Sequence, residues 1–287
     1  MSTLRTLIGS GRLLVVPGAA NALTARVIED CGFESVYVTG AGLANTHLGV
    51  PDIGLLTFSE LVAHVAAIRE AVSVPLIVDA DTGFGNPINV RRTVRDLERA
   101  GAGAIQIEDQ TFPKRCGHFA GKTVIPTEEM ITKIRAAVDA RRDDDTLIVA
   151  RTDARAVAGL GEACARANAY RDAGADVVFL EAPRTEAEIE TVAAEVRGPQ
   201  IINLVHGGVT PMLPERRLSE LGFAIALHAN LPLLAGIKGI QDALNTLRAG
   251  TAPGEAQLAS WAERQRLVRR AEFEELEARY TTQEGTS

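Results

Sequence analysis

The sequence contains little cysteine. Three cysteines occur among 287 residues, and none of them belongs to a CxxC pair. The spacing therefore indicates neither a disulfide framework nor a zinc site. Cys31 and Cys164 fall in helical patterns, where cysteine usually serves as a small buried apolar side chain. Only Cys116 has neighbours that point to chemistry.

The sequence also lacks an excess of positive charge and any long apolar run. Its formal net charge is −7, with Lys and Arg interleaved among Asp and Glu, which argues against nucleic-acid binding. No run approaches the ~20 apolar residues of a membrane span, and the start lacks the apolar core of a signal peptide. We therefore expect a cytoplasmic protein that binds neither nucleic acid nor a membrane.

Short runs rich in Val, Ile and Leu alternate with segments of helical periodicity, which predicts a parallel sheet covered by helices. Several predicted helices end in Gly directly before the next strand, as a left-handed helix cap requires. About eight such units without a composition break predict one (β/α)8 TIM barrel domain over residues 1–287. A Rossmann-like sheet is the alternative, but no GxGxxG follows a strand. The predicted strands are LLVVPG, SVYVTG, PLIVDADTG, AIQIEDQ, LIVARTDA, DVVFLEAP, QIINLVHG and AIALHAN.

The chain continues well beyond the last predicted strand. Residues 254–280 have the pattern of a long amphipathic helix that a barrel does not need. Its apolar positions, which include Trp261, Leu267, Phe273 and Leu276, must be buried somewhere. We therefore predict that this segment is an oligomerisation helix.

Polar side chains gather at the ends of the predicted strands, where barrel enzymes hold their active sites. Alternation along a strand places Tyr37 with Thr39 on one face, and Gln106 with Glu108 on another. The runs LIVAR, DVVFLE and QIIN end in one polar residue each, two positions after an apolar residue that would fill the barrel. These three residues are Arg151, Glu181 and Asn203.

Asp79, Asp81 and Glu108 bring several carboxylates to this mouth. Crowded carboxylates repel one another unless a cation or a proton compensates them. Because they offer only oxygen ligands, they favour Mg²⁺ or Mn²⁺ over zinc. The alternative is that DADTG is a solvated turn whose Asp residues cap the next helix.

A long connection, residues 111–126, follows the fourth predicted strand and has the character of a lid. Lys114, Arg115 and His118 surround Cys116 there and should stabilise its thiolate, so that it can transfer a proton near neutral pH. Gly117 allows the backbone to approach a ligand. His118 either supports the loop or carries a second proton. The alternative is an exposed loop with an incidental cysteine.

The segments VDADTGFGN, IQIEDQ with KRCGH, ARTDA, FLEAP and NLVHGG resemble the isocitrate lyase and phosphoenolpyruvate mutase superfamily. The resemblance covers nearly the whole chain and is closest to the 2-methylisocitrate lyase and 2,3-dimethylmalate lyase branches. It implies a homotetramer in which neighbouring subunits exchange a C-terminal helix. It also implies Mg²⁺ on Asp79 and Asp81, with Glu108 and Asp52 in the water-mediated shell around it.

The same resemblance implies how a small carboxylate substrate binds and reacts. Thr39, Gly40 and Ala41 would bind a substrate carboxylate, and Arg151, Glu181 and Asn203 would hold the 2-oxo acid portion. The reaction would break a carbon–carbon bond of a 2-hydroxy di- or tricarboxylate and release a 2-oxo acid and a carboxylate. Tyr37 is the candidate base or relay for the hydroxyl proton, and Cys116 would protonate the carbanion.

Two departures from the methylisocitrate lyase pattern bear on the substrate. Val205 and His206 stand where those enzymes carry the Thr and Glu of NxTE, and HANLPLLAG lacks their arginine for an additional carboxylate. A 2-alkylmalate therefore fits at least as well as 2-methylisocitrate. The alternatives are an oxaloacetate-type hydrolase or decarboxylase of the same superfamily and, from another class, a non-catalytic metabolite-binding barrel. A loop cysteine argues against a mere binder.

Overall fold

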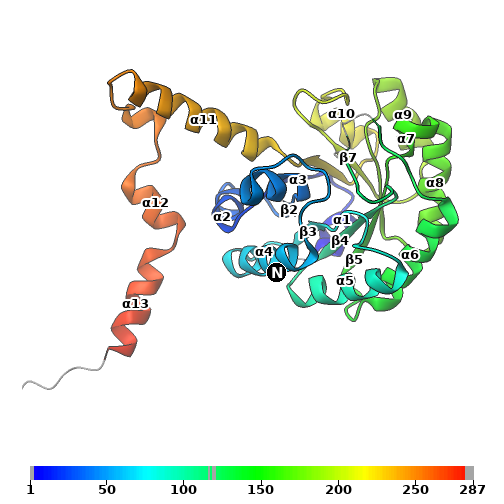
Figure 1. Cartoon of the computed structure of the whole chain (residues 1–287), viewed down its shortest axis with the longest axis horizontal. Helices are drawn as coiled ribbons and strands as arrows, with labels where there is room; N and C mark the ends of the chain where they lie inside the picture. The colour runs from blue at the N-terminus through cyan, green and yellow to red at the C-terminus, as the bar shows by residue number, and fades with distance from the viewer. Residues whose placement is uncertain (1–2, 116, 118–120, 282–287) are drawn as a thin grey trace, which may run out of the picture. The chain divides into compact units, whose positions relative to one another are not determined.

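A computed structural model describes residues 3–115, 117 and 121–281 of the chain. Eight parallel strands follow one another around a closed barrel, and β8 pairs with β1 through Leu14 opposite Ile225 (Figure 1). The predicted (β/α)8 barrel is confirmed, and each predicted apolar run supplies one strand. The strands are β1 Leu14–Ala19, β2 Val36–Val38, β3 Leu76–Asp79, β4 Ala104–Glu108, β5 Leu147–Thr152, β6 Val177–Leu180, β7 Gln200–Asn203 and β8 Ile225–His228.

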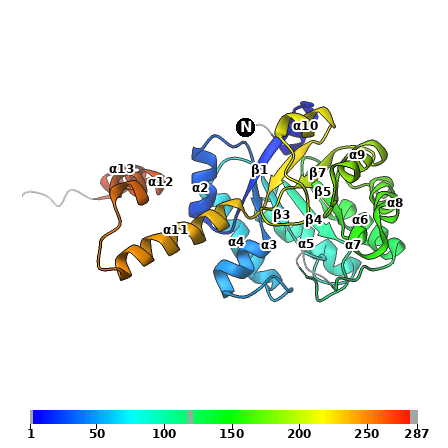
Figure 2. The ribbon, with the colours of Figure 1, turned by 90° about the horizontal axis from the view of Figure 1, so that it is seen from above.

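The helices of the barrel surround the strands (Figure 2). Side chains that begin helices accept hydrogen bonds from free backbone N–H groups, as Thr57 does with Glu60 in a capping box. All four glycines expected to cap helices have positive φ: Gly32, Gly101, Gly174 and Gly222. The helical elements of this part are α1 Leu4–Gly9, α2 Ala22–Asp30, α3 Gly40–Leu43, η1 Ala44–Leu48, α4 Phe58–Ala71, α5 Pro87–Arg99, α6 Thr127–Ala140, α7 Ala154–Ala158, α8 Leu160–Asp172, α9 Glu186–Glu195 and α10 Glu215–Glu220.

Side chains alternate between two apolar layers along each strand. Ile77, Val149 and Phe179 belong to the cluster that fills the barrel interior. Val78 and Ile148, each one position away, belong to the cluster between the sheet and the helices. This period of two means that the next inward residue beyond the interior layer lies at the carboxyl end of the strand. The polar strand ends therefore converge on one mouth.

The chain divides into two compact units, and the barrel strands all lie in the first, up to Leu233. The second unit contains most of α11 Leu231–Arg248, followed by η2 Glu255–Gln257, α12 Trp261–Leu267 and α13 Arg270–Tyr280. None of the described residues 234–281 is buried. No helix in the described part of the chain has both the length and the apolar character needed to cross a membrane.

Residues 254–280 differ from the single continuous helix expected from the sequence. The helix α12 starts at its own cap, where Ser260 accepts a hydrogen bond from the Glu263 N–H. Arg269 then adopts the left-handed conformation, with a φ of 55°, and separates α12 from α13. A residue in that conformation interrupts the helical hydrogen-bond ladder. The apolar pattern of the sequence is therefore divided between two helices.

Candidate active site

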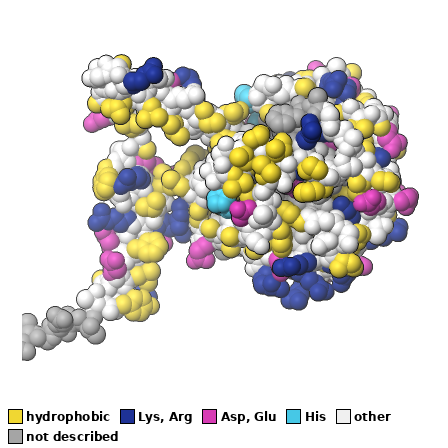
Figure 3. Space-filling view, viewed as in Figure 1, with side chains coloured by type: hydrophobic (Ala, Val, Ile, Leu, Met, Phe, Trp, Pro, Cys, Tyr) yellow, Lys and Arg dark blue, Asp and Glu magenta, His cyan; other side chains and the backbone are white. Residues whose placement is uncertain are grey.

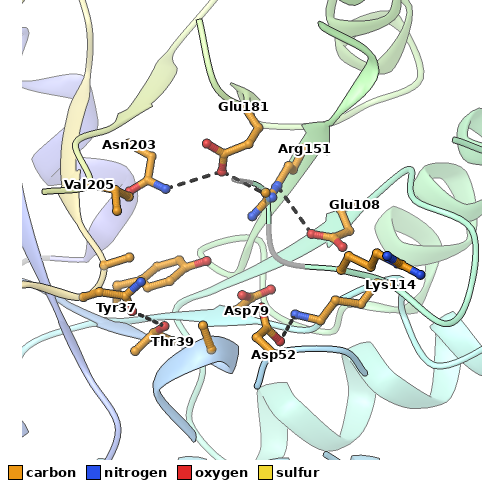
Figure 4. A pocket seen from close by; sticks show the side chains of 15 residues that line it. Tyr37, Thr39, Asp52, Asp79, Glu108, Lys114, Arg151, Glu181, Asn203 and Val205 are labelled. Atoms are coloured by element: carbon orange, nitrogen blue, oxygen red, sulfur yellow. Dashed lines mark hydrogen bonds and ion pairs between the residues drawn. The ribbon is translucent and has the colours of Figure 1, made fainter. Parts of the chain in front are cut away.

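The carboxyl ends of the strands line one pocket (Figure 4). Most residues predicted from the sequence to form the site contribute to its wall. Cys116 and His118 lie outside the described residues. The wall contains Tyr37, Thr39, Ala41, Asp52, Asp79, Glu108, Lys114, Arg115, Gly117, Arg151, Glu181, Asn203, Val205, Ala229 and Asn230.

Asp79 is fixed at the end of β3 by hydrogen bonds on one carboxylate oxygen. Its Oδ1 accepts from the Asp81 N–H and from Gln106 Nε2, both at 3.2 Å. A Cβ on Gly40 would lie 3.1 Å from Asp79 Oδ2 and 3.2 Å from Asp81 Oδ1. The predicted residues Gly40 and Asp81 thus stand directly beside the pocket wall, with the backbone of α3 facing both carboxylates.

Lys114 reaches from the loop after β4 into this group of carboxylates. Its Nζ lies 2.5 Å from Asp52 Oδ1 and 2.7 Å from Asp81 Oδ1. Burial alone would lower the pKa of Lys114, but the surrounding carboxylates, Asp81 foremost, outweigh it and raise the pKa well above its usual value. The ammonium therefore stays charged and serves as a counter-ion for the carboxylates.

Arg151 forms the centre of a second group on the opposite side. Its Nε and Nη2 donate to the Asp153 carboxylate at 2.9 and 3.1 Å. Ion pairs of 3.4 Å to Glu108 and 3.2 Å to Glu181 complete its surroundings, and the guanidinium carbon lies 5.1 Å from the ring centre of Phe179 below. The guanidinium is thus held in a fixed orientation by carboxylates on several sides.

Negative charge exceeds positive charge around this mouth. The buried carboxylates are Asp52, Asp79, Asp81, Glu108, Asp153 and Glu181, and the buried cations among the described residues there are Lys114, Lys122 and Arg151. Burial is the main cause that raises the pKa of Asp81 to about 7, and it also raises the pKa of Glu108. Such shifts are expected where carboxylates lack a sufficient counter-charge.

The donor set fits a hard divalent cation in its chemistry. Glu108 Oε1 is buried without a hydrogen-bond partner, and Asp79, Asp81 and Asp52 add only oxygen ligands. Among the described residues, no group of three or more Asp, Glu, His or Cys side chains lies close enough together to hold a metal ion. The Lys114 ammonium instead pairs with Asp52 and Asp81.

Residues 4–248 match the family model described as phosphoenolpyruvate phosphomutase. The chain belongs to this family. It is 43% identical over 281 residues to 2,3-dimethylmalate lyase of Eubacterium barkeri, covering 97% of each chain. It is 46% identical over 244 residues to 2-methylisocitrate lyase of Aeropyrum pernix, covering 85% of this chain and 78% of that one.

Solved structures of the phosphoenolpyruvate mutase and isocitrate lyase superfamily share the fold throughout. A 2,3-dimethylmalate lyase structure superposes with a TM-score of 0.91 at 35% identity and covers 99% of this chain and 96% of that one. Oxaloacetate acetylhydrolase with 3,3-difluorooxalacetate gives 0.91 at 32% identity, covering 96% and 95%. Phosphonopyruvate hydrolase with oxalate and Mg²⁺ gives 0.87 at 33%, covering 96% and 97%. The predicted superfamily is confirmed, and the protein is an enzyme of this lyase and mutase superfamily.

Tyr37, the candidate base or relay for the hydroxyl proton, lines the pocket. A phenol acts as a base only if its pKa is lowered. Burial foremost, and then the Asp79 carboxylate, instead raise the pKa of Tyr37 well above its usual value. Its hydroxyl donates to Gln106 Oε1 at 3.2 Å. Tyr37 therefore stands as a hydrogen-bond donor to Gln106, and its role as base or relay stays a prediction.

Some residues in and behind the pocket wall were not predicted from the sequence. Asn230, two residues after the end of β8, lines the pocket and accepts a hydrogen bond from Thr39 Oγ1 at 3.4 Å. Asp153 and Lys122 lie behind Arg151 and form an ion pair of 2.6 Å. Asp153 could have been found, because ARTDA places a second charge two positions after Arg151. The pairing of Lys122 had no local signal.

Proposed function

We propose that this enzyme is a divalent-metal-dependent carbon–carbon lyase that cleaves a small 2-hydroxy dicarboxylate into a 2-oxo acid and a carboxylate. The observation that carries the proposal is the pairing of one preorganised guanidinium, Arg151, with a carboxylate group that fits a divalent cation across the same pocket. A 2-oxo acid needs both an anion site and a hard cation. The similarity to named carbon–carbon lyases supports the same reaction class.

Asp79, Asp81, Glu108 and Asp52 would hold Mg²⁺ or Mn²⁺. When bound, the ion would supply Lewis-acid stabilisation of the negative charge that develops on substrate oxygens. A relative of the same fold, phosphonopyruvate hydrolase, was solved with oxalate and Mg²⁺, which supports this assignment.

The remaining roles follow from where the side chains lie. Arg151, Glu181 and Asn203 would orient the 2-oxo acid end, since Asn203 Nδ2 donates to Glu181 Oε2 at 3.4 Å and Arg151 pairs with the same oxygen. Thr39, Gly40 and Ala41 would bind the other carboxylate through hydroxyl and N–H groups. Tyr37 would donate a hydrogen bond to a substrate oxygen.

The proton balance of the cleavage requires one base and one acid. The 2-hydroxyl passes its proton to a base, for which Tyr37 is the candidate as a relay, the carbon–carbon bond breaks, and the electron pair of that bond passes to the departing carboxylate fragment as a carbanion. We assign protonation of that carbanion to Cys116, on the sequence pattern KRCGH. His118 would support the same loop.

The wall formed after β7 and β8 favours a dicarboxylate over a tricarboxylate. Val205, Ala229 and Asn230 line the pocket there, and each of the three is uncharged. An alkyl substituent can pack against such a wall, whereas a third carboxylate would be desolvated without a cation. The proposal therefore favours 2-alkylmalates over 2-methylisocitrate.

A second candidate is hydrolytic cleavage of oxaloacetate. It is favoured by the superposition on oxaloacetate acetylhydrolase, whose TM-score equals that of 2,3-dimethylmalate lyase. The two reactions place a 2-oxo acid or oxalate on the same anion site. Product analysis separates them.

Incubation with Mg²⁺ and a substrate panel tests the proposed function. The panel contains 2,3-dimethylmalate, citramalate, 2-methylisocitrate, isocitrate and oxaloacetate, and every product acid is identified by mass spectrometry. We expect pyruvate from a 2-alkylmalate, with turnover abolished by EDTA and reduced at least ~100-fold by Cys116→Ser. Cys31→Ser is the matched control, because Cys31 is an exposed helix cap and should leave the rate unchanged.

Each other outcome has its own meaning. Acetate and oxalate from oxaloacetate would assign the hydrolase reaction instead. Turnover that resists EDTA would contradict the metal role. Binding of these acids without any turnover would identify a metabolite-binding barrel.

We also propose that the enzyme is a homotetramer that buries the apolar side chains of its second unit between subunits. Trp261 is 66% and Phe273 is 59% exposed, and Figure 3 shows further apolar side chains on the surface of α11 to α13. A unit in which no described residue is buried gains little stability from its own packing.

The double variant Trp261→Arg and Phe273→Arg should dissociate the tetramer into smaller species at micromolar concentration. Size-exclusion chromatography with light scattering measures the mass. The control is Ile88→Arg, at an exposed position of α5 in the first unit, which should leave the mass unchanged. A double variant that keeps the wild-type mass, or a wild-type protein that is monomeric, would refute this assembly.

A further inference from the structure

A buried ion pair lies behind the pocket and is not part of its wall. Lys122 Nζ lies 2.6 Å from Asp153 Oδ1, and the two side chains are 2% and 0% exposed. Neither residue lines the pocket. Burying an ammonium group costs free energy. The buried position of Lys122 therefore suggests a role other than solubility or surface charge.

Asp153 connects Lys122 to Arg151. The Asp153 carboxylate accepts from Arg151 through both of its oxygens, and Oδ1 is shared with Lys122. Burial would raise the pKa of Asp153, but Arg151 and Lys122 outweigh it and lower the pKa. Its backbone N–H donates to Asp109 Oδ1 at 2.9 Å. The carboxylate is thus held between two cations on a fixed backbone and sets the plane of the guanidinium.

Lys122 makes a second contact with the loop that follows β4. Its Nζ donates to the carbonyl oxygen of Gly117. A Cβ on Gly117 would lie 2.4 Å from Arg151 Nη2 and 2.7 Å from Glu181 Cγ, so the loop backbone touches both anchors of the 2-oxo acid end. One ammonium therefore fixes Arg151 through Asp153 and the adjacent loop through Gly117.

The end of this loop has its own, separate anchor. Arg166 Nη1 donates to the Ile125 carbonyl at 2.8 Å, and the Ile125 N–H donates to the Asp109 carbonyl at 2.8 Å. Asp109 Oδ2 in turn accepts from Tyr170 and Thr152. These contacts attach the end of the loop to the barrel without Lys122. The contacts of Lys122 can therefore serve to orient Arg151 and the backbone at Gly117.

We propose that Lys122 is a positioning residue for the cleavage reaction: through Asp153 and Gly117 it holds Arg151 and the loop backbone in the orientation that receives the 2-oxo acid. The kinetic part of this inference rests on the proposed function. Lys122 does not touch the substrate, so it acts only through these two partners.

The test compares Lys122→Met with Arg141→Met. Arg141 forms a partly buried ion pair of 2.7 Å with Asp176, before β6 at the amino ends of the strands, and loses a similar interaction far from the pocket. Lys122→Met should lower kcat about 100-fold, as expected when a substrate-orienting group is misplaced by about 1 Å. Arg141→Met should keep kcat within about threefold of wild type, even where its Tm falls equally.

Oxalate with Mg²⁺ serves as a binding probe that does not depend on turnover. Calorimetry should show that Lys122→Met binds oxalate about tenfold more weakly than wild type does. Arg141→Met should bind oxalate with the wild-type affinity. Lys122→Gln keeps a hydrogen-bond donor and is the second variant should Met not fold. It should show a smaller loss of both quantities.

A double-mutant cycle with Asp153→Asn completes the test. If the pair acts as one unit, the double variant should be no worse than the poorer single variant. Unchanged kcat and oxalate affinity in Lys122→Met, additive losses in the cycle, or equal losses in Arg141→Met would overturn the inference. If wild type cleaves no 2-hydroxy carboxylate, the proposed function fails, while the oxalate measurements still decide the role of Lys122.

Discussion

Replacing Arg151 by Met should lower kcat/KM about a thousandfold or more and reduce the free energy of unfolding by about 3–5 kcal/mol. The side chain is the shared partner of Asp153, Glu108 and Glu181. Methionine fills a similar volume but leaves three buried carboxylates without their guanidinium. Steady-state kinetics and urea denaturation measure the two effects.

Arg155→Met is the matched control for that variant. Arg155 also makes a bidentate pair, with Glu188, in a partly buried position on α7. We expect a stability loss without a comparable loss of kcat/KM. If Arg151→Met retained more than a tenth of the wild-type kcat/KM, Arg151 would not be the anion site that the proposal requires.

Asp79→Asn should have opposite effects on metal binding and on metal-free stability. Loss of a ligand charge should weaken Mg²⁺ binding by at least ~100-fold and lower kcat/KM about a thousandfold, the size of several kcal/mol of lost Lewis-acid stabilisation. The metal-free protein should instead have a higher Tm, because one of several repelling carboxylates is removed. The amide oxygen can still accept from the Asp81 N–H and Gln106.

Isothermal calorimetry with Mg²⁺ and thermal unfolding in EDTA measure these effects. The control is Asp172→Asn, whose carboxylate is exposed and pairs with Arg197 on the surface. It should change neither quantity appreciably. A metal-free Asp79→Asn protein that is less stable than wild type would show that Asp79 has a structural role in place of a ligand role.

The barrel and the wall of the site were predictable because a strand has a fixed period. Two residues after the inward-facing Val149 comes Arg151, and two after Phe179 comes Glu181. The period therefore places charge at the mouth from local sequence alone. The same reasoning placed Asp79, Glu108 and Asn203 correctly on the pocket wall.

Contacts that depend on loop paths had no such periodic signal. Lys114 was expected to act on the neighbouring cysteine, yet its ammonium reaches Asp52 and Asp81, which are distant in sequence. The pairing of Lys122 with Asp153 spans 31 positions. The break between α12 and α13 at Arg269 could not be predicted either. Arginine ordinarily favours a helix, and nothing in the sequence indicates its left-handed conformation here.

Because the eight strands are arranged as a ring, different tasks fall to different arcs of it. The carboxylates proposed to bind the cation lie at or after the ends of β2, β3 and β4, the groups proposed to bind the 2-oxo acid lie at or after the ends of β5, β6 and β7, and the uncharged wall follows β7 and β8. Val205 and Ala229 of the third arc are apolar, whereas Asn230 is joined to Thr39 by a hydrogen bond. We therefore expect that exchange of the uncharged side chains of the third arc changes which substrate fits, while the charged groups of the other two arcs keep their places.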